Sequence, residues 1–210
     1  MFPRRQESNH FRYFVDLFRS PSPRGQKLGI SQGLHLTIRQ QKGLWECTEL
    51  SSLESLGWGD YQWVIVGNLP QLPPETVLGI FLYQDDEHEI DALELSRWGQ
   101  PERPNAQFCL QPSGKDSIRR FEVHSRTITV RLSWREDKVQ FTCWEGETPG
   151  ASQPIADWTY TGPKLFKPGR EKVHINFWLM GGKAPASQQP LEVLVKSFSF
   201  RPSPNAAPDQ

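Results

Sequence analysis

The chain has 210 residues, and its 24 basic and 24 acidic side chains leave no formal net charge at pH 7. That length is typical of a single domain with a sizeable hydrophobic core. A neutral chain has no long-range field to attract nucleic acid or an anionic membrane, so we expect neither as a partner. The eight tryptophans are unusually many, and their flat apolar rings suit either core packing or sugar faces.

The sequence carries few targeting or cofactor signals. No apolar run is long enough for a signal peptide or a membrane span, which indicates the cytoplasm by default. Cys47, Cys109 and Cys143 are odd in number and have no metal-ligand spacing, so we interpret them as small buried hydrophobes in a reducing compartment. We expect a monomer without metal or organic cofactor.

We expect the chain to have three parts. Residues 1–25 form a partly flexible extension, in which 11–18 are apolar enough for a short strand or helix and 20–25 form a Ser- and Pro-rich loop. Residues 26–201 form the folded domain. Residues 202–210, rich in proline and alanine, form a disordered tail.

The first half of the domain is predicted to be a series of strands. Apolar and polar residues alternate over 34–38, which indicates a half-buried strand. Residues 60–66 form another strand, which follows a Gly-Trp-Gly turn that contains Trp58. Residues 77–83 are nearly all apolar, as is typical of a central strand covered on both faces.

The second half continues this pattern. Residues 118–124 lead into 127–134, and a charged turn joins that strand to 139–144 in a predicted hairpin. Residues 191–200 form the last strand. Helical periodicity is almost absent, so we predict an all-β sandwich of two packed antiparallel sheets, one with a concave face.

One segment of the second half breaks the series of strands. Residues 146–169 are rich in turn residues, so we predict a loop. Trp158 and Tyr160 lie within it, and we expect them to form one wall of a cleft.

Three carboxylates stand close together in Glu-Ile-Asp-Ala-Leu-Glu at residues 89–94. In a regular strand Glu89 and Asp91 point to one face, whereas Glu94, at an odd spacing, points to the other. One extra residue bulged at Ala92–Leu93 would bring the three acids to one face and would also correct the aliphatic positions. Like charges side by side repel one another, so stability alone does not favour this arrangement. The alternative is a solvated acidic strand face.

Such a face is suited to glycoside hydrolysis. A retaining glycosidase needs two carboxyl groups roughly 5–5.5 Å apart, one as nucleophile and one as acid/base. Neighbouring carboxylates push their pKa values apart, so that one is ionised while the other keeps its proton near neutral pH. A third acid between them can form a hydrogen bond with the nucleophile.

Residues 89–94 resemble the catalytic signature of glycoside hydrolase family 16 in its longer, bulged form. Members of that family are jelly-roll β-sandwiches of the concanavalin-like lectin/glucanase type. The resemblance implies that Glu89 is the nucleophile, Asp91 the assisting acid and Glu94 the general acid/base. It also implies a β-linked polysaccharide, of β-glucan or galactan type, as substrate, and this indicates an extracellular or periplasmic location. It covers roughly residues 26–200 and is specific only at the signature.

The sequence departs from the family pattern in two strands. Phe81 stands where the family usually has a tryptophan, and Ile128 and Val130 align with positions where the family carries a histidine and an aromatic residue. These departures favour a non-catalytic carbohydrate-binding module, whereas the intact signature favours a hydrolase. A purely protein-binding sandwich is a third alternative, because one fold hosts many functions.

The strand predicted at 173–180 has an apolar face and a polar face that combines hydrogen-bonding and stacking groups. The family carries a similar Asn-x-Trp strand beside its cleft. The alternative for its histidine is a hydrogen-bonded residue on a polar sheet surface, and for the tryptophans it is core packing. We expect six residues to bind the substrate: Trp58, Phe81, Trp98, His174, Asn176 and Trp178.

Overall fold

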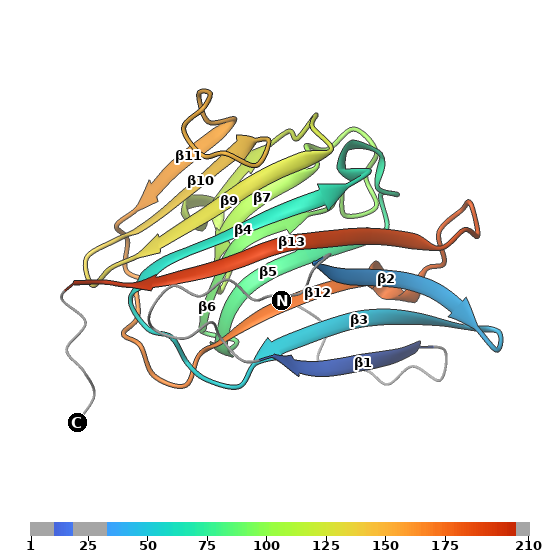
Figure 1. Cartoon of the computed structure of the whole chain (residues 1–210), viewed down its shortest axis with the longest axis horizontal. Coiled ribbons are helices and arrows are strands. Elements are labelled where there is room, and N and C mark those ends of the chain that lie inside the picture. Colours follow the sequence, from blue (N-terminus) through green and yellow to red (C-terminus); the bar gives the residue numbers. More distant parts are fainter. Residues whose placement is uncertain (1–10, 19–32, 205–210) are drawn as a thin grey trace.

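The computed structural model describes residues 33–204, together with the backbone of a strand at 11–18 (Figure 1). The loop predicted at 20–25 lies outside the described residues, and so does the expected disordered tail from residue 205 onward. The segment at 11–18, for which the sequence left strand and helix open, is a strand.

The described residues form thirteen strands and three short 3-10 helices. The strands of the first half are β1 (Phe11–Phe18), β2 (Leu34–Gln41), β3 (Leu44–Ser52), β4 (Gly59–Gly67), β5 (Thr76–Asp85), β6 (His88–Leu95) and β7 (Ala106–Leu110). Those of the second half are β8 (Ile118–Phe121), β9 (Thr127–Trp134), β10 (Val139–Glu145), β11 (Ala156–Tyr160), β12 (Lys172–Leu179) and β13 (Leu191–Pro202). The 3-10 helices are η1 (Leu69–Gln71), η2 (Lys115–Ser117) and η3 (Met180–Gly182).

The strands follow one hydrogen-bonded path, β11-β10-β9-β4-β13-β2-β3-β12-β5-β6-β7-β8, which folds over at β2. Strand β2 pairs with β13 on one side and with β3 on the other, so it joins two layers (Figure 1). The predicted all-β sandwich is confirmed. Among the described pairs, β1 with β3 is parallel, whereas the prediction was antiparallel throughout.

Local sequence explains two hairpins, of which the one between β9 and β10 was predicted. Strands β9 and β10 pair as expected, with Trp134 opposite Val139. Between β2 and β3, Lys42 and Gly43 have φ of 52° and 80° and form a two-residue turn between Gln41 and Leu44. Positive φ at both central residues is typical of the tight hairpin turn that matches strand twist.

The predicted loop at 146–169 is wrong in part, because it contains β11, which pairs with β10. This edge strand has only five residues, so its alternation is too short to stand out from the surrounding turn residues. Trp158 stacks on Phe141 at 5.1 Å and packs against the hydrophobic core. The prediction that Trp158 and Tyr160 form a cleft wall is therefore wrong.

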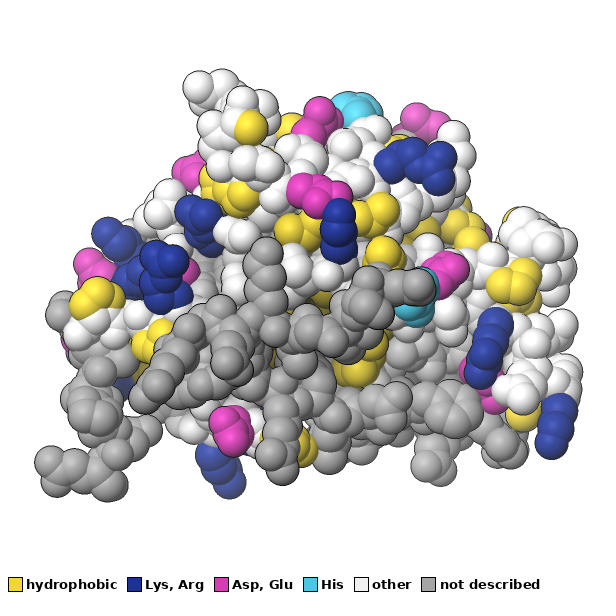
Figure 2. Space-filling view, in the orientation of Figure 1, with side chains coloured by type: hydrophobic (Ala, Val, Ile, Leu, Met, Phe, Trp, Pro, Cys, Tyr) yellow, Lys and Arg dark blue, Asp and Glu magenta, His cyan; other side chains and the backbone are white. Residues whose placement is uncertain are grey.

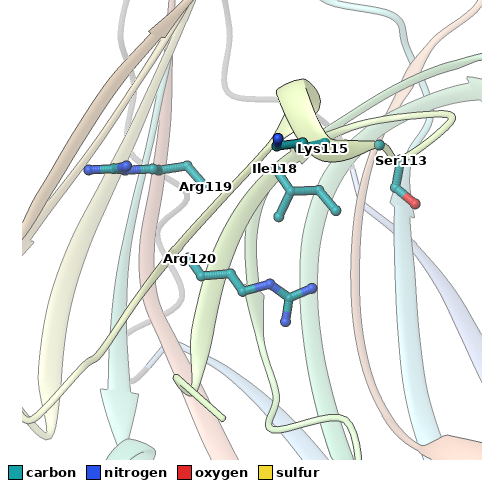
Figure 3. A pocket seen from close by; sticks show the side chains of 6 residues that line it. Ser113, Lys115, Ile118, Arg119 and Arg120 are labelled. Carbon is teal, nitrogen blue, oxygen red and sulfur yellow. The ribbon is translucent and has the colours of Figure 1, made fainter.

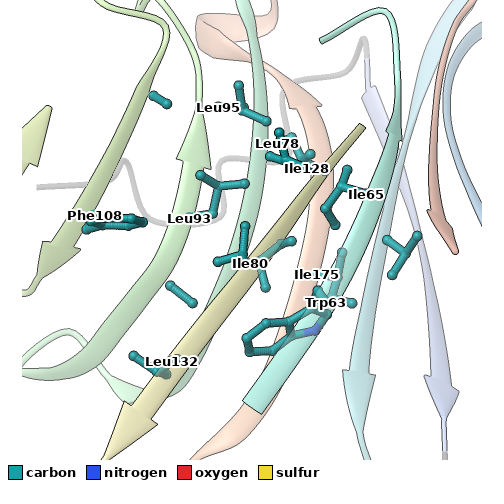
Figure 4. Packing of buried hydrophobic residues seen from close by; sticks show 14 of the residues in the cluster. Trp63, Ile65, Leu78, Ile80, Leu93, Leu95, Phe108, Ile128, Leu132 and Ile175 are labelled. Carbon is teal, nitrogen blue, oxygen red and sulfur yellow. The ribbon is translucent and has the colours of Figure 1, made fainter. Parts of the chain in front are cut away.

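The core lies between the two layers (Figure 4). Phe108 of β7 stacks on Phe141 of β10 with ring centroids 5.2 Å apart, and this contact joins the layers directly. Ile128 and Val130 are fully buried here, on β9 of the layer opposite β6. These two residues, where the family carries a histidine and an aromatic residue, are therefore not part of the face that bears the acids.

The surface is consistent with a neutral chain. Figure 2 shows basic and acidic side chains interspersed over the described part of one face. The described residues include no helix with the length and apolar character that a membrane crossing requires.

Candidate active site

Strand β6 carries the three acids and has a bulge in its middle. In the pairing with β5, Phe81 lies opposite Asp91 and Ile80 lies opposite Leu93, so Ala92 is skipped. The pairing with β7 shifts register over the same residues. The bulge predicted at Ala92–Leu93 from the spacing of acids and aliphatics is confirmed.

The bulge brings the three acids to one face of the sheet. Carboxylate oxygens of Asp91 and Glu94 lie within 4.8 Å of each other, and the Glu89 and Asp91 carboxyl groups are hydrogen-bonded. The intervening Ile90 and Leu93 are buried in the core. We call the outward face of this layer, which bears Glu89, Asp91 and Glu94, the acid face.

The row of residues through Glu94 extends across five strands. Glu94 lies opposite Gly79 on β5 and Gln107 on β7, Gly79 lies opposite Asn176 on β12, and Gln107 lies opposite Arg120 on β8. The Gln107 amide donates to Glu94 at 2.5 Å. Asn176 Oδ1 accepts the Gly79 N–H at 3.1 Å, and a Cβ at position 79 would lie 2.5 Å from that oxygen, so the close approach requires glycine.

The row through Asp91 supplies hydrogen bonds to the assisting acid. Gln111, at the end of β7, donates its side-chain amide to Asp91 Oδ2 at 3.0 Å. Cys109 lies opposite Asp91, and its thiol sulfur is within 4.8 Å of carboxylate oxygens of both Asp91 and Glu94. Among the described residues, Asp91, Glu94 and Cys109 are the group placed closely enough to hold a metal ion.

Sequence reasoning missed three side chains, on β7 and directly after it, that contact the acids. Gln107, Cys109 and Gln111 occupy alternate positions and all face β6. The signal was present, since Ala-Gln-Phe-Cys-Leu-Gln at 106–111 alternates in the manner of a strand. What the sequence could not supply was the register that places each amide against its acid.

Aromatic side chains continue the acid face on β5 and β12. His174 stacks on Phe81 with ring centroids 5.1 Å apart and an interplanar angle of 20°, and it meets Tyr83 edge to face at 5.8 Å. His174 Nδ1 also lies 3.3 Å from Glu49 Oε1. The imidazole is therefore held in place by a hydrogen bond and two rings, which agrees with the alternative interpretation of His174.

The three tryptophans predicted to bind the substrate lie in different parts of the structure. Trp178 is half-buried on the acid face, two residues beyond Asn176 on β12. Trp98 lies in the turn after β6, with a left-handed φ of 52°, and its backbone N–H donates to Ser96 Oγ at 2.9 Å. Trp58 precedes β4 in the opposite layer and packs against the hydrophobic core, so the structure does not bring it to the acids.

Burial controls the protonation of the acids, which are 7% (Glu89), 1% (Asp91) and 3% (Glu94) exposed. Desolvation raises the pKa of Glu89 to about 7, and the hydrogen bond from Asp91 opposes this rise. Desolvation and then the Asp91 charge raise the pKa of Glu94 well above its usual range. Desolvation and then the Glu89 charge do the same to the pKa of Asp91. Burial therefore favours the protonated form of all three acids.

Proteins of known structure share this fold. No family model and no curated protein matches the chain. A β-1,3-glucanase from Mycobacterium marinum has a similar structure, with 19% identity, a TM-score of 0.62, and coverage of 80% of this chain and 73% of that one. A family 16 glycosyl hydrolase protein from Mycobacterium smegmatis has 16% identity, a TM-score of 0.60, and coverage of 80% and 74%.

The chain has the glycoside hydrolase family 16 fold. A further structure with that fold is described as an immunostimulatory antigen and pseudo β-1,3-glucanase of Mycobacterium tuberculosis, with 19% identity, a TM-score of 0.62, and coverage of 81% of this chain and 75% of that one. Structures similar to this chain thus include a protein described as a β-1,3-glucanase and one described as a pseudo β-1,3-glucanase. The activity of this chain therefore has to be argued from its own acid face.

Proposed function

We propose that the protein is a retaining endo-glycoside hydrolase that acts on a β-linked polysaccharide. The observation that carries this proposal is the bulge at Ala92–Leu93, which turns Glu89, Asp91 and Glu94 to one face. A register that buries three acids side by side lowers the stability of the fold. A catalytic role for the acids would explain why the chain has this register. The raised pKa of Glu94 supports its role as the general acid, since a general acid must keep its proton near neutral pH.

The reaction proceeds in two displacements at the anomeric carbon. In the first, the Glu94 carboxyl gives its proton to the glycosidic oxygen while a Glu89 carboxylate oxygen attacks the anomeric carbon. The bond to the leaving sugar breaks and a glycosyl–Glu89 ester forms. In the second, the Glu94 carboxylate takes a proton from water, whose oxygen attacks the same carbon and releases Glu89. The two inversions give net retention.

Two neighbouring groups support these steps. Asp91 is hydrogen-bonded to Glu89, and this bond stabilises the Glu89 carboxylate before attack and after release. The Gln107 amide donates to Glu94 and fixes one of its oxygens. That bond also lowers the pKa of Glu94 against the effect of burial, which keeps the second step, in which Glu94 acts as a base, within reach.

Glycan binding without cleavage is a second candidate. Two observations favour it: the acids are 7% exposed or less, and one protein of the same fold is described as a pseudo-glucanase. In this case the aromatic part of the acid face, with Phe81 and Trp178, would hold the sugar and the acids would remain as unused groups.

Reducing-end release from β-1,3, β-1,4 and mixed-linkage glucans and from galactans separates the two candidates. We expect wild type and the exposed control Glu145→Gln to cleave one polymer class, and Glu89→Gln to lose about a thousandfold or more of that rate. If wild type cleaves none of them but retards one in affinity electrophoresis, the protein is a binding module.

Azide rescue then tests the roles of the two glutamates on an activated aryl glycoside. Azide should restore Glu94→Ala with retained configuration, because it attacks a glycosyl–Glu89 ester. It should restore Glu89→Ala with inverted configuration, because it attacks the substrate directly. The opposite pattern would exchange the two assignments.

A further inference from the structure

An open depression lies on the acid face, beyond β7 and at the edge of the sheet. Its volume is about 640 Å³, and it is lined by Ser113, Gly114, Lys115, Ile118, Arg119 and Arg120 (Figure 3). We call it the basic pocket.

Strand register connects the basic pocket to the acids. Arg120 lies opposite Gln107, which lies opposite Glu94, and Ile118 lies opposite Cys109, which lies opposite Asp91. The pocket therefore begins two strands from the acids, about 10 Å away at the usual strand spacing. A polymer chain that lies across β6 and β7 continues directly into it.

Three cationic side chains line the pocket, and one of them, Arg120, also interacts electrostatically with Glu94. Figure 3 shows Arg119 and Arg120 extending to opposite sides of β8, with Lys115 above them. None of the three belongs to an ion pair within the described part of the chain. The nearest acids along the sequence are Asp116 in η2 and Glu122, and Glu122 is already paired with Arg97 at 2.5 Å.

A fourth cation is fixed at the rim from a distant segment. Lys164 Nζ donates to Ser117 Oγ at 2.9 Å and to the carbonyl oxygen of Pro112. It lies 3.6 Å from the place that a Cβ on Gly114 would occupy. Two acceptors hold this ammonium in place, so binding of an anion requires little further loss of side-chain conformational entropy.

We propose that the basic pocket binds a sulfate or carboxylate group carried by an acidic β-linked polysaccharide whose backbone lies over Glu89 and Glu94. The inference rests on the proposed function, since it identifies the class of substrate for that site. Four cations border the pocket, with Arg119 and Arg120 on opposite sides of β8, and like charges repel one another until an anion joins them. Guanidinium groups match planar and tetrahedral oxyanions through paired N–H donors, and Ile118 offers an apolar contact for the sugar ring that carries the anion.

Matched polymers test this inference. Linear β-1,3-glucan and a neutral galactan are each compared with their own sulfated and carboxymethylated derivatives, so that only the charged group differs. We expect dissociation constants about tenfold lower for a charged derivative than for its neutral parent at low salt, as several rim charge pairs can provide. The advantage should largely disappear in 0.5 M salt because the charges are then screened within about 4 Å. The derivative with the larger advantage identifies the anion.

The variant for this experiment combines Lys115→Gln, Arg119→Gln and Lys164→Gln. Its matched control combines three exposed cations of the other layer, Lys138→Gln, Lys196→Gln and Arg201→Gln, with the same change in net charge. The pocket variant should lose the preference for charged polymers, and the control should keep it. If the pocket variant does not fold, the salt dependence of wild type still decides the question.

The outcomes for the pocket and for the hydrolase are distinct. Equal affinity for charged and neutral polymers, or equal losses in both triple variants, overturns the pocket even when wild type cleaves a neutral polymer. Salt-sensitive preference for a charged polymer that is never cleaved supports the pocket and overturns the hydrolase.

Discussion

Replacement of Glu89 by glutamine should stabilise the protein at alkaline pH while it abolishes activity. Burial raises the pKa of this carboxyl from its usual 4.5 to about 7. The folded protein then binds the proton more tightly than the unfolded chain does, so wild-type stability falls as pH rises from about 4.5 to about 7. At about 1.36 kcal/mol per pKa unit, the free energy of unfolding should be about 3 kcal/mol higher for Glu89→Gln at pH 8.

Urea unfolding of wild type, Glu89→Gln and the exposed control Glu145→Gln at pH 4 and pH 8 measures this difference. At pH 8 the gain corresponds to roughly 6–12 °C in Tm for a chain of this size. At pH 4 it should nearly vanish, because the wild-type carboxyl is protonated in both states. A gain of the same size at both pH values, or none at pH 8, would refute the conclusion that a buried, ionised Glu89 destabilises the fold.

Three further results follow from the same geometry. The pH profile of kcat/KM should be bell-shaped, with an acid limb near pH 7 from Glu89 and an alkaline limb where Glu94 loses its proton; an acid limb near pH 4 would contradict it. In wild type the hydrogen bond from Gln107 lowers the pKa of Glu94, so Gln107→Met should raise that pKa and move the alkaline limb to higher pH. Gln111→Met should leave that limb in place, because Gln111 donates to Asp91 instead. A chromogenic thiol reagent should react with the folded protein at neutral pH far more slowly than with the unfolded protein, because burial raises the pKa of all three thiols: Cys47, Cys109 and Cys143.

The bulge could be predicted from the sequence because the spacing of the acids and the spacing of the aliphatic residues both change at the same place. The acids change parity between Asp91 and Glu94, and the aliphatics change parity between Ala92 and Leu93. A strand whose inner face is buried cannot tolerate a slip of one residue, so both patterns locate the insertion. The all-β fold followed from the same alternation in the longer strands.

Contacts between distant segments could not be predicted from the sequence. Alternation at 127–134 predicts a strand but does not say which layer it joins, so the burial of Ile128 and Val130 in the layer opposite the acids could not be predicted. The position of Gln107 against Glu94 depends on a register that continues across the turns between β6 and β7. Lys164 reaches the basic pocket from a segment 47 residues beyond Ser117, and no local pattern reports that approach.

Strand β8 ends the layer that bears the acid face, so its outer backbone groups are not paired with another described strand. An unpaired sheet edge is a template for a strand from another molecule, and such contacts lead to aggregation. This edge has four residues and carries Arg119 and Arg120, and both its shortness and its charge oppose association of like edges. Variants that neutralise these arginines should therefore be judged by their colloidal behaviour as well as by their binding, because one strand serves both properties.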